Sequence, residues 1–347
     1  MIKVGIVGAG GYAGQELVRL ITQHPQAEIK CMTARSDAGK SYAEVYGNYK
    51  EIDERILTED DLATIAEECD VVFIALPHGV AAQSVTEDIL SKTKIIDLGA
   101  DFRLKDADVY EKWYKVKHEN REMLKDAVYG LCEVNRDIIK GKNLVANPGC
   151  YTTCSILTMY PLLKEGLVET KGIIIDAKSG VSGAGRNVLQ QSLYCERNEC
   201  VKPYGVANHR HTPEIEEQLG YAAGEDITLI FTPHLIPMNR GILSTCYGRL
   251  KDGVTYEDVK AAYEKYYADE KFVRLTKRGV WPETRWVKGT NYLDIGFEVD
   301  ERTNTVIAAG AIDNLVKGAA GQAVQNMNIL FGLDEKTGLE LVPVFPA

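Results

Sequence analysis

The first 21 residues restrict the possible fold more than any other part of the chain. Residues 2–7 form a short apolar stretch typical of a buried strand. A glycine-rich segment, residues 8–14, follows directly, and residues 15–21 then show the helical spacing of apolar side chains. A strand, a glycine turn and a helix in this order begin a dinucleotide-binding βαβ unit. We therefore predict an α/β fold whose N-terminal domain is a doubly wound sheet of Rossmann type.

The glycine turn supplies candidate residues for holding a dinucleotide. Gly8 permits the tight turn, Gly10 lets the backbone approach a pyrophosphate, and Ala13 stands where Gly or Ala is usual. The glycines can also be read in three-residue steps, as Gly8, Gly11 and Gly14. The predicted cofactor-binding residues of this segment are Gly8, Gly10, Gly11, Tyr12, Ala13 and Gly14.

The end of the second predicted strand, residues 28–33, bears on which dinucleotide is bound. An acidic residue there would hold the ribose 2′-hydroxyl of NAD, whereas Arg35 and Ser36 follow in this chain. An arginine and a hydroxyl suit a 2′-phosphate, so we expect NADP. Asp37 lies close enough to keep NAD as an alternative, and a solvated surface charge is the simpler interpretation of Arg35.

Two further predicted strands, residues 70–76 and 94–99, end in segments with polar or turn-forming residues. Pro77 begins a Pro-His-Gly turn where a parallel strand would meet the cofactor, so we predict that it contacts the dinucleotide. Arg103 follows the later strand, and its guanidinium could fork onto a phosphate or carboxylate. An ordinary ion pair with Asp101 or Asp106 is an equally good interpretation of Arg103.

Cys150 is the candidate nucleophile. Residues 143–146 resemble a strand and residues 153–160 a helix, and a Pro-Gly turn between them puts Cys150 at or near the helix N-terminus. Unpaired N–H groups and the helix dipole favour negative charge there, so the thiol loses its proton more easily and becomes a nucleophile. A buried cysteine that acts as a small hydrophobe is the alternative.

The second half of the chain has a different pattern. Strand-like runs joined by hairpins and helices predict an α+β second domain with a largely antiparallel, mixed sheet. These runs are residues 172–178, 226–231, 242–250, 292–299 and 304–309, with a helix at 255–267. A last helix at 314–331 contains small residues and is expected to pack back on the first domain. We predict an NADP-binding domain at 1–149, completed by 314–331, and a catalytic and oligomerisation domain at 150–313.

Two segments of the second domain contain candidate site residues. Residues 179–186 combine glycines and serines after a strand and are suited to wrapping a nicotinamide or an anion, although a flexible turn has the same composition. Residues 208–215 contain His209 and His211, either of which could act as general acid or base beside a thiol. Thr212 as an N-cap explains the start of the following helix but does not explain the histidines.

Composition excludes several classes of function. The formal net charge of −10 argues against nucleic acid or an anionic membrane as partner. No apolar run approaches the roughly 20 residues of a membrane span, and no leader precedes the first strand, so we expect a cytoplasmic protein. The eight cysteines are scattered without zinc-site spacing, so we expect free thiols and no metal.

Together these residues resemble the N-acetyl-gamma-glutamyl-phosphate reductase family, arginine-biosynthesis relatives of aspartate-semialdehyde dehydrogenase. The resemblance extends over nearly the whole chain, and the Asn-Pro-Gly-Cys-Tyr and His-Arg-His-Thr-Pro-Glu blocks are specific as a pair. The matching segments are residues 8–14, 77–79, 99–103, 129–133, 147–152, 179–186, 209–215, 231–237, 240–242 and 311–318.

The resemblance implies a reaction and roles for residues. Cys150 would attack an acyl phosphate to form a thioester, and NADPH would reduce it to the semialdehyde. His209, in preference to His211, would pair with the thiolate and protonate the hydride-derived alkoxide. Asn314 would hold the nicotinamide carboxamide, with Ser179 and Gly180 nearby. The implied substrate-binding residues are Arg103, Ser182, Arg186 and Glu214, and a homodimer or homotetramer is expected.

The sequence allows two alternatives to this function. One is a sibling reductase that acts on aspartyl phosphate or aminoadipyl phosphate; the block at 209–215 argues against the former and the chain argues only weakly against the latter. The other is an NADP-binding redox sensor that uses Cys150. A sensor needs only a reactive thiol, so His209 and Arg103 argue against it.

Overall fold

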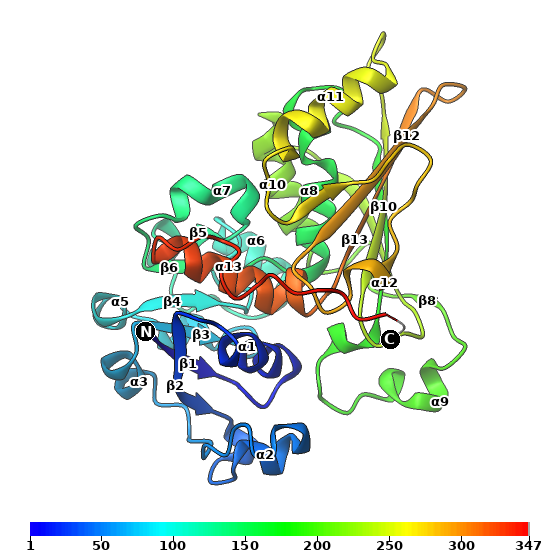
Figure 1. The fold of residues 1–347 in the computed structure, drawn as a ribbon. Coiled ribbons are helices and arrows are strands. Elements are labelled where there is room, and N and C mark those ends of the chain that lie inside the picture. The colour runs from blue at the N-terminus through cyan, green and yellow to red at the C-terminus, as the bar shows by residue number, and fades with distance from the viewer. Residues whose placement is uncertain (346–347) are drawn as a thin grey trace. The chain divides into compact units, whose positions relative to one another are not determined.

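The computed structural model describes residues 1–345, apart from the side chain of Gln191, and they form two compact units (Figure 1). The first unit comprises Met1–Pro148 and Ala319–Glu340. The second comprises Gly149–Gly318 and residues 341–345. Within the described residues, no helix has both the length and the apolar composition needed to cross a membrane.

The first unit is built on a six-stranded sheet in which every pairing is parallel. Its order is β2-β1-β3-β4-β6-β5, so the chain turns to opposite sides of β1 and creates the switch point at which open α/β sheets bind ligands. This confirms the predicted Rossmann-type sheet. The strands are β1 (Ile2–Val7), β2 (Ala27–Thr33), β3 (Val71–Ile74), β4 (Lys94–Asp97), β5 (Val128–Tyr129) and β6 (Leu144–Ala146).

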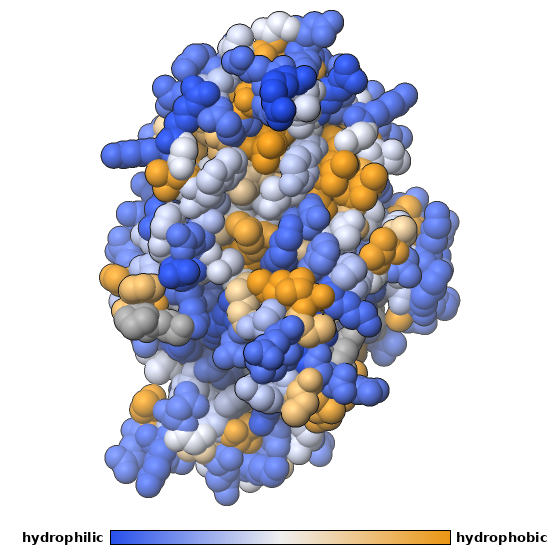
Figure 2. Space-filling model, turned by 90° about the vertical axis from the view of Figure 1, so that its right-hand side faces the viewer, coloured by the Kyte–Doolittle hydropathy of each residue, from blue (hydrophilic) through white to orange (hydrophobic). Residues whose placement is uncertain are grey.

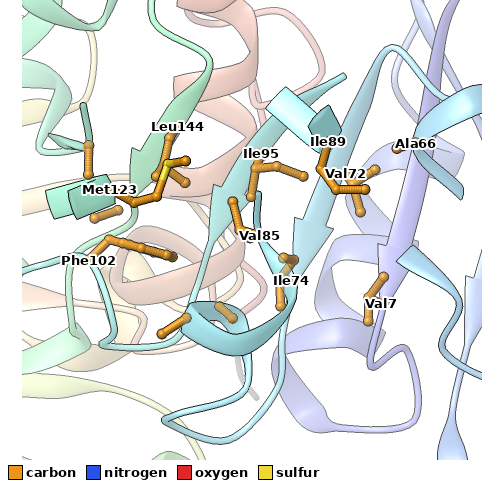
Figure 3. Close-up of a cluster of buried hydrophobic side chains, with 14 of the residues drawn as sticks. Val7, Ala66, Val72, Ile74, Val85, Ile89, Ile95, Phe102, Met123 and Leu144 are labelled. Carbon is orange, nitrogen blue, oxygen red and sulfur yellow. The ribbon is translucent and has the colours of Figure 1, made fainter. Parts of the chain in front are cut away.

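Helices cover this sheet because its strands are apolar on both faces. Figure 3 shows Val72, Ile74 and Ile95 of the sheet pointing toward Val85 and Ile89 of the covering segments, in a cluster of buried side chains. The helices of this unit are α1 (Tyr12–Thr22), α2 (Tyr42–Val45), α3 (Leu62–Glu68), α4 (Ala81–Ser84), α5 (Glu87–Lys92), α6 (Ala107–Tyr114), α7 (Cys132–Ile139) and α13 (Gly321–Leu330).

The C-terminal helix packs on the first unit, as predicted. Helix α13 contacts α1, α7 and β4, and all ten of its residues are buried (Figure 1). The sequence predicts that this helix begins at residue 314, but it begins later. Residues Val316–Ala320 form a π-helical turn, and the α-helix starts at Gly321. The Asp313 carboxylate accepts the backbone N–H groups of Leu315 and Val316 and so satisfies donors at the start of this turn.

The second unit contains a seven-stranded mixed sheet with the order β11-β12-β13-β10-β7-β9-β8. Two pairings, β7 with β9 and β11 with β12, are parallel and the other four are antiparallel, which confirms the predicted largely antiparallel sheet. The strands are β7 (Ile173–Ser179), β8 (Lys202–Pro203), β9 (Leu229–Leu235), β10 (Ile242–Arg249), β11 (Val273–Leu275), β12 (Leu293–Asp300) and β13 (Thr305–Ile312).

Helix α8 is the centre of the second unit, and all its residues except Cys150, Tyr160 and Lys164 are buried. Pro161 lies inside it and has no N–H for the carbonyl of Leu157. The Tyr267 hydroxyl donates to that carbonyl at 2.6 Å and restores a partner. The helices of this unit are α8 (Cys150–Lys164), α9 (Tyr194–Arg197), α10 (Thr212–Ala223), α11 (Tyr256–Tyr267) and α12 (Thr284–Val287).

Strand β9 differs from its prediction. It spans Leu229–Leu235, whereas the sequence pattern indicates residues 226–231. Pro233 lies within it and cannot donate to a neighbouring strand, but its carbonyl accepts the Tyr204 N–H at 3.0 Å. The strand therefore continues past the proline and brings His234 beside Pro203 of β8.

Candidate active site

Cys150 is the first residue of helix α8, as the sequence predicts. Gly149 is the N-cap with extended backbone angles, and no side chain caps the helix through that residue. Cys150 is partly exposed, whereas Cys154, one turn later, is fully buried and burial raises its thiol pKa well above the ordinary value. Of these two thiols on α8, Cys150 alone combines access with a position at the start of the helix.

Glu214 anchors the start of α8 to the start of α10. Its carboxylate is 1% exposed and accepts the Gly149 N–H at 3.0 Å. Thr152 Oγ1 lies 2.7 Å from the same Oε1. A carboxylate at a helix N-terminus is stabilised by the helix dipole. These contacts support a role in holding the nucleophile's turn, which differs from the expected contact with substrate.

His209 lies among aromatic rings that come from separate segments. Its ring centroid is 5.7 Å from that of Tyr151 on α8, 5.3 Å from Tyr204, 5.3 Å from Phe231 on β9 and 4.9 Å from His211. Burial, and secondarily the charge of Arg210, lower the pKa of His209 to about 4. Burial therefore favours the neutral imidazole over the imidazolium of the expected ion pair.

A pair of phenols connects His209 to the neighbourhood of Cys150. Tyr204 Oη donates to Tyr151 Oη at 3.1 Å, and Tyr151 Oη donates to the carbonyl of His234 at 3.2 Å. Burial raises the pKa of both phenols, and negative charge on Cys150 raises them further. Tyr204 was not predicted from the sequence, because it lies outside every motif and reaches the site only through the pairing of β8 with β9.

The loop after β7 brings two predicted residues together. Asn314 Nδ2 donates to Ser182 Oγ at 3.0 Å, and Asn314 Oδ1 accepts the Gly241 N–H at 2.8 Å. Ser179 ends β7, and its Oγ donates to the Gly180 carbonyl at 3.0 Å. Gly180 follows it directly and is the N-cap of the 3-10 turn Val181–Ala184. The exposed Arg186 lies beyond this turn.

The guanidinium of Arg103, which the sequence suggests as a ligand for a phosphate or carboxylate, is buried against backbone carbonyls. Its side chain is 5% exposed, and its Nε and Nη2 donate to the carbonyls of Asn147 and Leu98, each at 2.8 Å. Asn147 is three residues before Cys150 in the chain. The geometry therefore makes Arg103 a support for the backbone that leads to the nucleophile.

The glycine turn after β1 has the shape that a dinucleotide requires. Gly8 has φ +90°, and a Cβ there would lie 2.5 Å from the Ala75 carbonyl oxygen. A Cβ on Gly14 would lie 2.2 Å from the Gly8 carbonyl oxygen, so the turn cannot hold larger residues at either position. Gly10, Gly11, Tyr12 and Ala13 surround the start of α1, whose N-cap Gly11 offers no capping side chain. The helix N-terminus is thus suited to a pyrophosphate.

Residues after β2 and β3 lie at the carboxyl edge of the first sheet. Arg35 begins a 3-10 turn (Arg35–Asp37), is 64% exposed and pairs with Asp60 at 2.6 Å. Ser36 Oγ donates to Asp37. Pro77, after β3, is exposed. The structure therefore leaves both the arginine and the acid near the position that distinguishes NADP from NAD.

Residues 1–345 contain no group of three or more His, Cys, Asp or Glu side chains that could hold a metal ion. All eight cysteines lie in this range, and all are free thiols.

Two family models match the chain. The semialdehyde dehydrogenase NAD binding domain matches residues 3–142, and the semialdehyde dehydrogenase dimerisation domain matches residues 150–314. The fold is also that of solved semialdehyde dehydrogenases. Aspartate semialdehyde dehydrogenase II from Vibrio cholerae superimposes with a TM-score of 0.72 at 16% identity, covering 96% of this chain and 99% of that one. The enzyme from Candida albicans, solved with NADP, gives 0.67 at 18% identity, covering 95% and 98%.

Relatives of high identity cover the whole chain. N-acetyl-gamma-glutamyl-phosphate reductase from Lachnospira eligens is 60% identical, and that from Lachnoclostridium phytofermentans is 58% identical, each over all of both chains. The Campylobacter jejuni enzyme (serotype O:6) is 54% identical over 98% of both chains. These matches make the chain an oxidoreductase with a nicotinamide dinucleotide domain, and it belongs to the N-acetyl-gamma-glutamyl-phosphate reductase family.

Proposed function

We propose that this enzyme reduces N-acetyl-L-glutamyl 5-phosphate with NADPH, reversibly, to N-acetyl-L-glutamate 5-semialdehyde and phosphate, a step of arginine biosynthesis. The observation that carries the proposal is Cys150 at the N-terminus of α8, followed directly by Tyr151, whose ring packs against that of His209. Identity of 52–60% to reductases of this name supports the substrate. Eight free thiols suit a reducing cytoplasm.

Acylation of Cys150 is the first chemical step. The thiolate attacks the acyl carbon, a C–S bond forms, the C–O bond to phosphate breaks, and phosphate leaves with the electron pair. The start of α8 favours the thiolate through its dipole. Glu214 and Arg103 hold the two ends of the Asn-Pro-Gly turn that precedes the thiol.

Reduction of the thioester is the second step, for which bound NADPH supplies a hydride. Addition of the hydride gives a thiohemiacetal alkoxide on Cys150, and its collapse expels the thiolate and releases the aldehyde. The imidazole of His209 donates a hydrogen bond to the oxygen that becomes negatively charged. The glycine turn at residues 8–14 and Pro77 hold the dinucleotide, with Ser179, Gly180 and Asn314 toward its nicotinamide.

The substrate carboxylate and phosphate need cationic or donor groups. Arg186 is exposed, and its guanidinium is the type of group that binds an anion; Ser182 supplies a hydroxyl beside Asn314. Arg103 and Glu214 contribute through the backbone they hold.

A direct test of this function is phosphate-dependent reduction of NADP by the purified enzyme with N-acetyl-L-glutamate 5-semialdehyde. We expect turnover that requires phosphate and is lower with the longer aminoadipate semialdehyde homologue. Preference for the longer homologue would assign the enzyme to lysine-type synthesis. A folded protein that binds NADP and turns over neither compound would leave the redox-sensor alternative.

Arg35 is expected to select NADP over NAD. Replacing Arg35 with alanine removes a charge-assisted contact to the 2′-phosphate and should raise KM for NADPH by roughly 10- to 100-fold, with little change for NADH. Lys40→Ala is the control, because Lys40 is a nearby exposed cation that pairs with Asp37. Equal effects of Arg35→Ala on both cofactors would contradict this assignment.

The open face of the second sheet is the proposed contact with a second copy of the chain. Helices α8, α10 and α11 lie on one side of β10 and β13, and Figure 2 looks onto the other side, where hydrophobic residues are gathered among polar ones. One row across four strands is Ile230, Ile174, Tyr247 and Ile307, which are register partners. The match of residues 150–314 to a dimerisation domain supports a homodimer or homotetramer built on this face.

A charged residue in this row is expected to weaken the assembly. Ile230→Glu places a charge where a partner would desolvate it, so sedimentation at micromolar concentration should show a smaller particle than the wild type. Ile138→Glu, on α7 of the first unit, is the matched control, because Ile138 and Ile230 are both 57% exposed. An unchanged sedimentation coefficient for Ile230→Glu would remove this face as the interface.

A further inference from the structure

Three of the six histidines make the same local hydrogen bond. In each, the ring Nδ1 accepts the backbone N–H of the residue two positions later in the chain. The pairs are His24 with Gln26 at 3.2 Å, His118 with Asn120 at 3.3 Å and His209 with His211 at 3.1 Å. A backbone N–H can only donate, so the Nδ1 atom that faces it carries no proton.

The other ring nitrogen of His24 and His118 shows what this bond means for the tautomer. His118 Nε2 lies 2.6 Å from the Asp101 carbonyl oxygen, which can only accept. His24 Nε2 lies 3.1 Å from Asn328 Oδ1. The amide of Asn328 is oriented by its Nδ2, which donates to the carbonyls of Glu335 and Thr337. In both histidines, therefore, the proton is on Nε2.

We infer that the His211 backbone N–H fixes His209 as a neutral imidazole protonated at Nε2, so that His209 is a standing hydrogen-bond donor and not the acceptor of the Cys150 proton. This rests on the proposed function, because it specifies what His209 does in that reaction. Protonation of Nδ1, in the other tautomer or in the imidazolium, would set two donors against each other at 3.1 Å.

The groups around the ring favour the neutral form. Arg210 is a cation and opposes an imidazolium, and the His211 ring centroid lies 4.9 Å from that of His209. Tyr151 from α8 and Tyr204 from the segment after β8 are phenols whose pKa is raised, so both are uncharged. Phe231 from β9 is apolar. The lowered pKa of His209 agrees with this environment.

A neutral donor satisfies the chemistry of the proposed reduction. The cycle begins with the Cys150 thiolate and ends with the same thiolate when the thiohemiacetal alkoxide collapses, so the histidine need not carry a proton away. Each step instead develops negative charge on the former carbonyl oxygen. A fixed N–H donor stabilises that charge without reorganisation. The thiol proton is then lost to solvent before the cycle, and the start of α8 favours that loss.

The tautomer is measurable by ¹⁵N NMR of the ring nitrogens in the full-length enzyme, with ¹⁵N-labelled histidine and the His209→Gln variant to identify the His209 signals. We expect an unprotonated-type signal for Nδ1 and a protonated-type signal for Nε2 at pH 7, unchanged to about pH 5. An imidazolium at pH 7, or a proton on Nδ1, would overturn the inference. The readout does not depend on turnover, so failure of the proposed function would show separately in the phosphate-dependent assay.

Two variants of residue 211 isolate the backbone donor. His211→Pro removes the N–H, and the φ of His211, −80°, lies within the proline range of about −65 ± 15°. His211→Ala keeps the N–H and removes only the ring. We expect His211→Ala to preserve the His209 tautomer, and His211→Pro to raise the midpoint of His209 titration by about one pH unit. The same titration in both variants would contradict the inference, and the wild-type spectrum alone decides if His211→Pro does not fold.

Discussion

Replacing Cys150 with serine is expected to lower kcat on the order of 10⁴-fold or more, because removal of a covalent nucleophile has effects of this size. A serine hydroxyl ionises far less readily than a thiol, and the helix N-terminus at Gly149 cannot make up that difference. NADPH binding, measured by fluorescence titration, should be unchanged, since the predicted dinucleotide residues lie elsewhere in the chain.

Cys154→Ser is the matched control for this experiment. Cys154 lies one turn further along α8, is fully buried and donates to the Gly310 carbonyl, a contact that a serine hydroxyl can also make. We expect its kcat to stay within about threefold of the wild type. Replacing a buried thiol with a hydroxyl changes the stability of the fold more than the chemical step. A Cys150→Ser enzyme that keeps wild-type kcat would exclude covalent catalysis through Cys150.

His209→Ala is expected to lower kcat by roughly 10²- to 10⁴-fold with a smaller change in KM, as loss of a group that acts mainly in the transition state does. The aromatic rings of Tyr151, Tyr204 and Phe231 would remain, so the cluster keeps much of its packing. His209→Gln should retain more activity than His209→Ala, because its amide can still donate a hydrogen bond. Steady-state kinetics of the two variants distinguish this donor role from a proton shuttle, for which both variants would lose activity equally.

The same variants give a pH-dependent stability difference. The folded-state pKa of His209, about 4, lies below its ordinary value of 6.5, so between these values the unfolded chain binds a proton that the folded chain does not. Stability that is present above pH 6.5 is therefore lost as pH falls toward 4. Urea unfolding at pH 7 and pH 5 should show a smaller decrease for His209→Gln than for the wild type. An equal decrease in both would show that His209 is not held neutral.

Much of the fold follows from local sequence patterns. The strand, glycine turn and helix at the N-terminus are specified by residues close in the chain, and so is the place of Cys150, because a Pro-Gly turn precedes an unbroken helical stretch. Strand β10 of the second sheet also alternates between buried and less buried positions. Local patterns do not fix the first residue of every helix. Thr212 is a residue type that favours the N-cap position, but it is the first residue of α10 and His211 is the N-cap.

The less predictable features depend on contacts between distant segments. Arg103 has the residue type of an anion ligand, and only the folded chain shows that its Nε and Nη2 donate to the Asn147 and Leu98 carbonyls. Tyr204 and Phe231 meet His209 because β8 and β9 pair, a contact that no local pattern encodes. Only the resemblance of residues 209–215 points to Glu214, and its bond to the Gly149 N–H depends on how α10 packs on α8.

The most direct test of the account is the mass of the enzyme after mixing with N-acetyl-L-glutamyl 5-phosphate in the absence of NADPH. We predict one added N-acetylglutamyl group per chain, located on the Cys150 peptide, lost on addition of NADPH and absent from Cys150→Ser. An enzyme that consumes the acyl phosphate on addition of NADPH yet never gains this mass, or gains it on another residue, would contradict the thioester at Cys150.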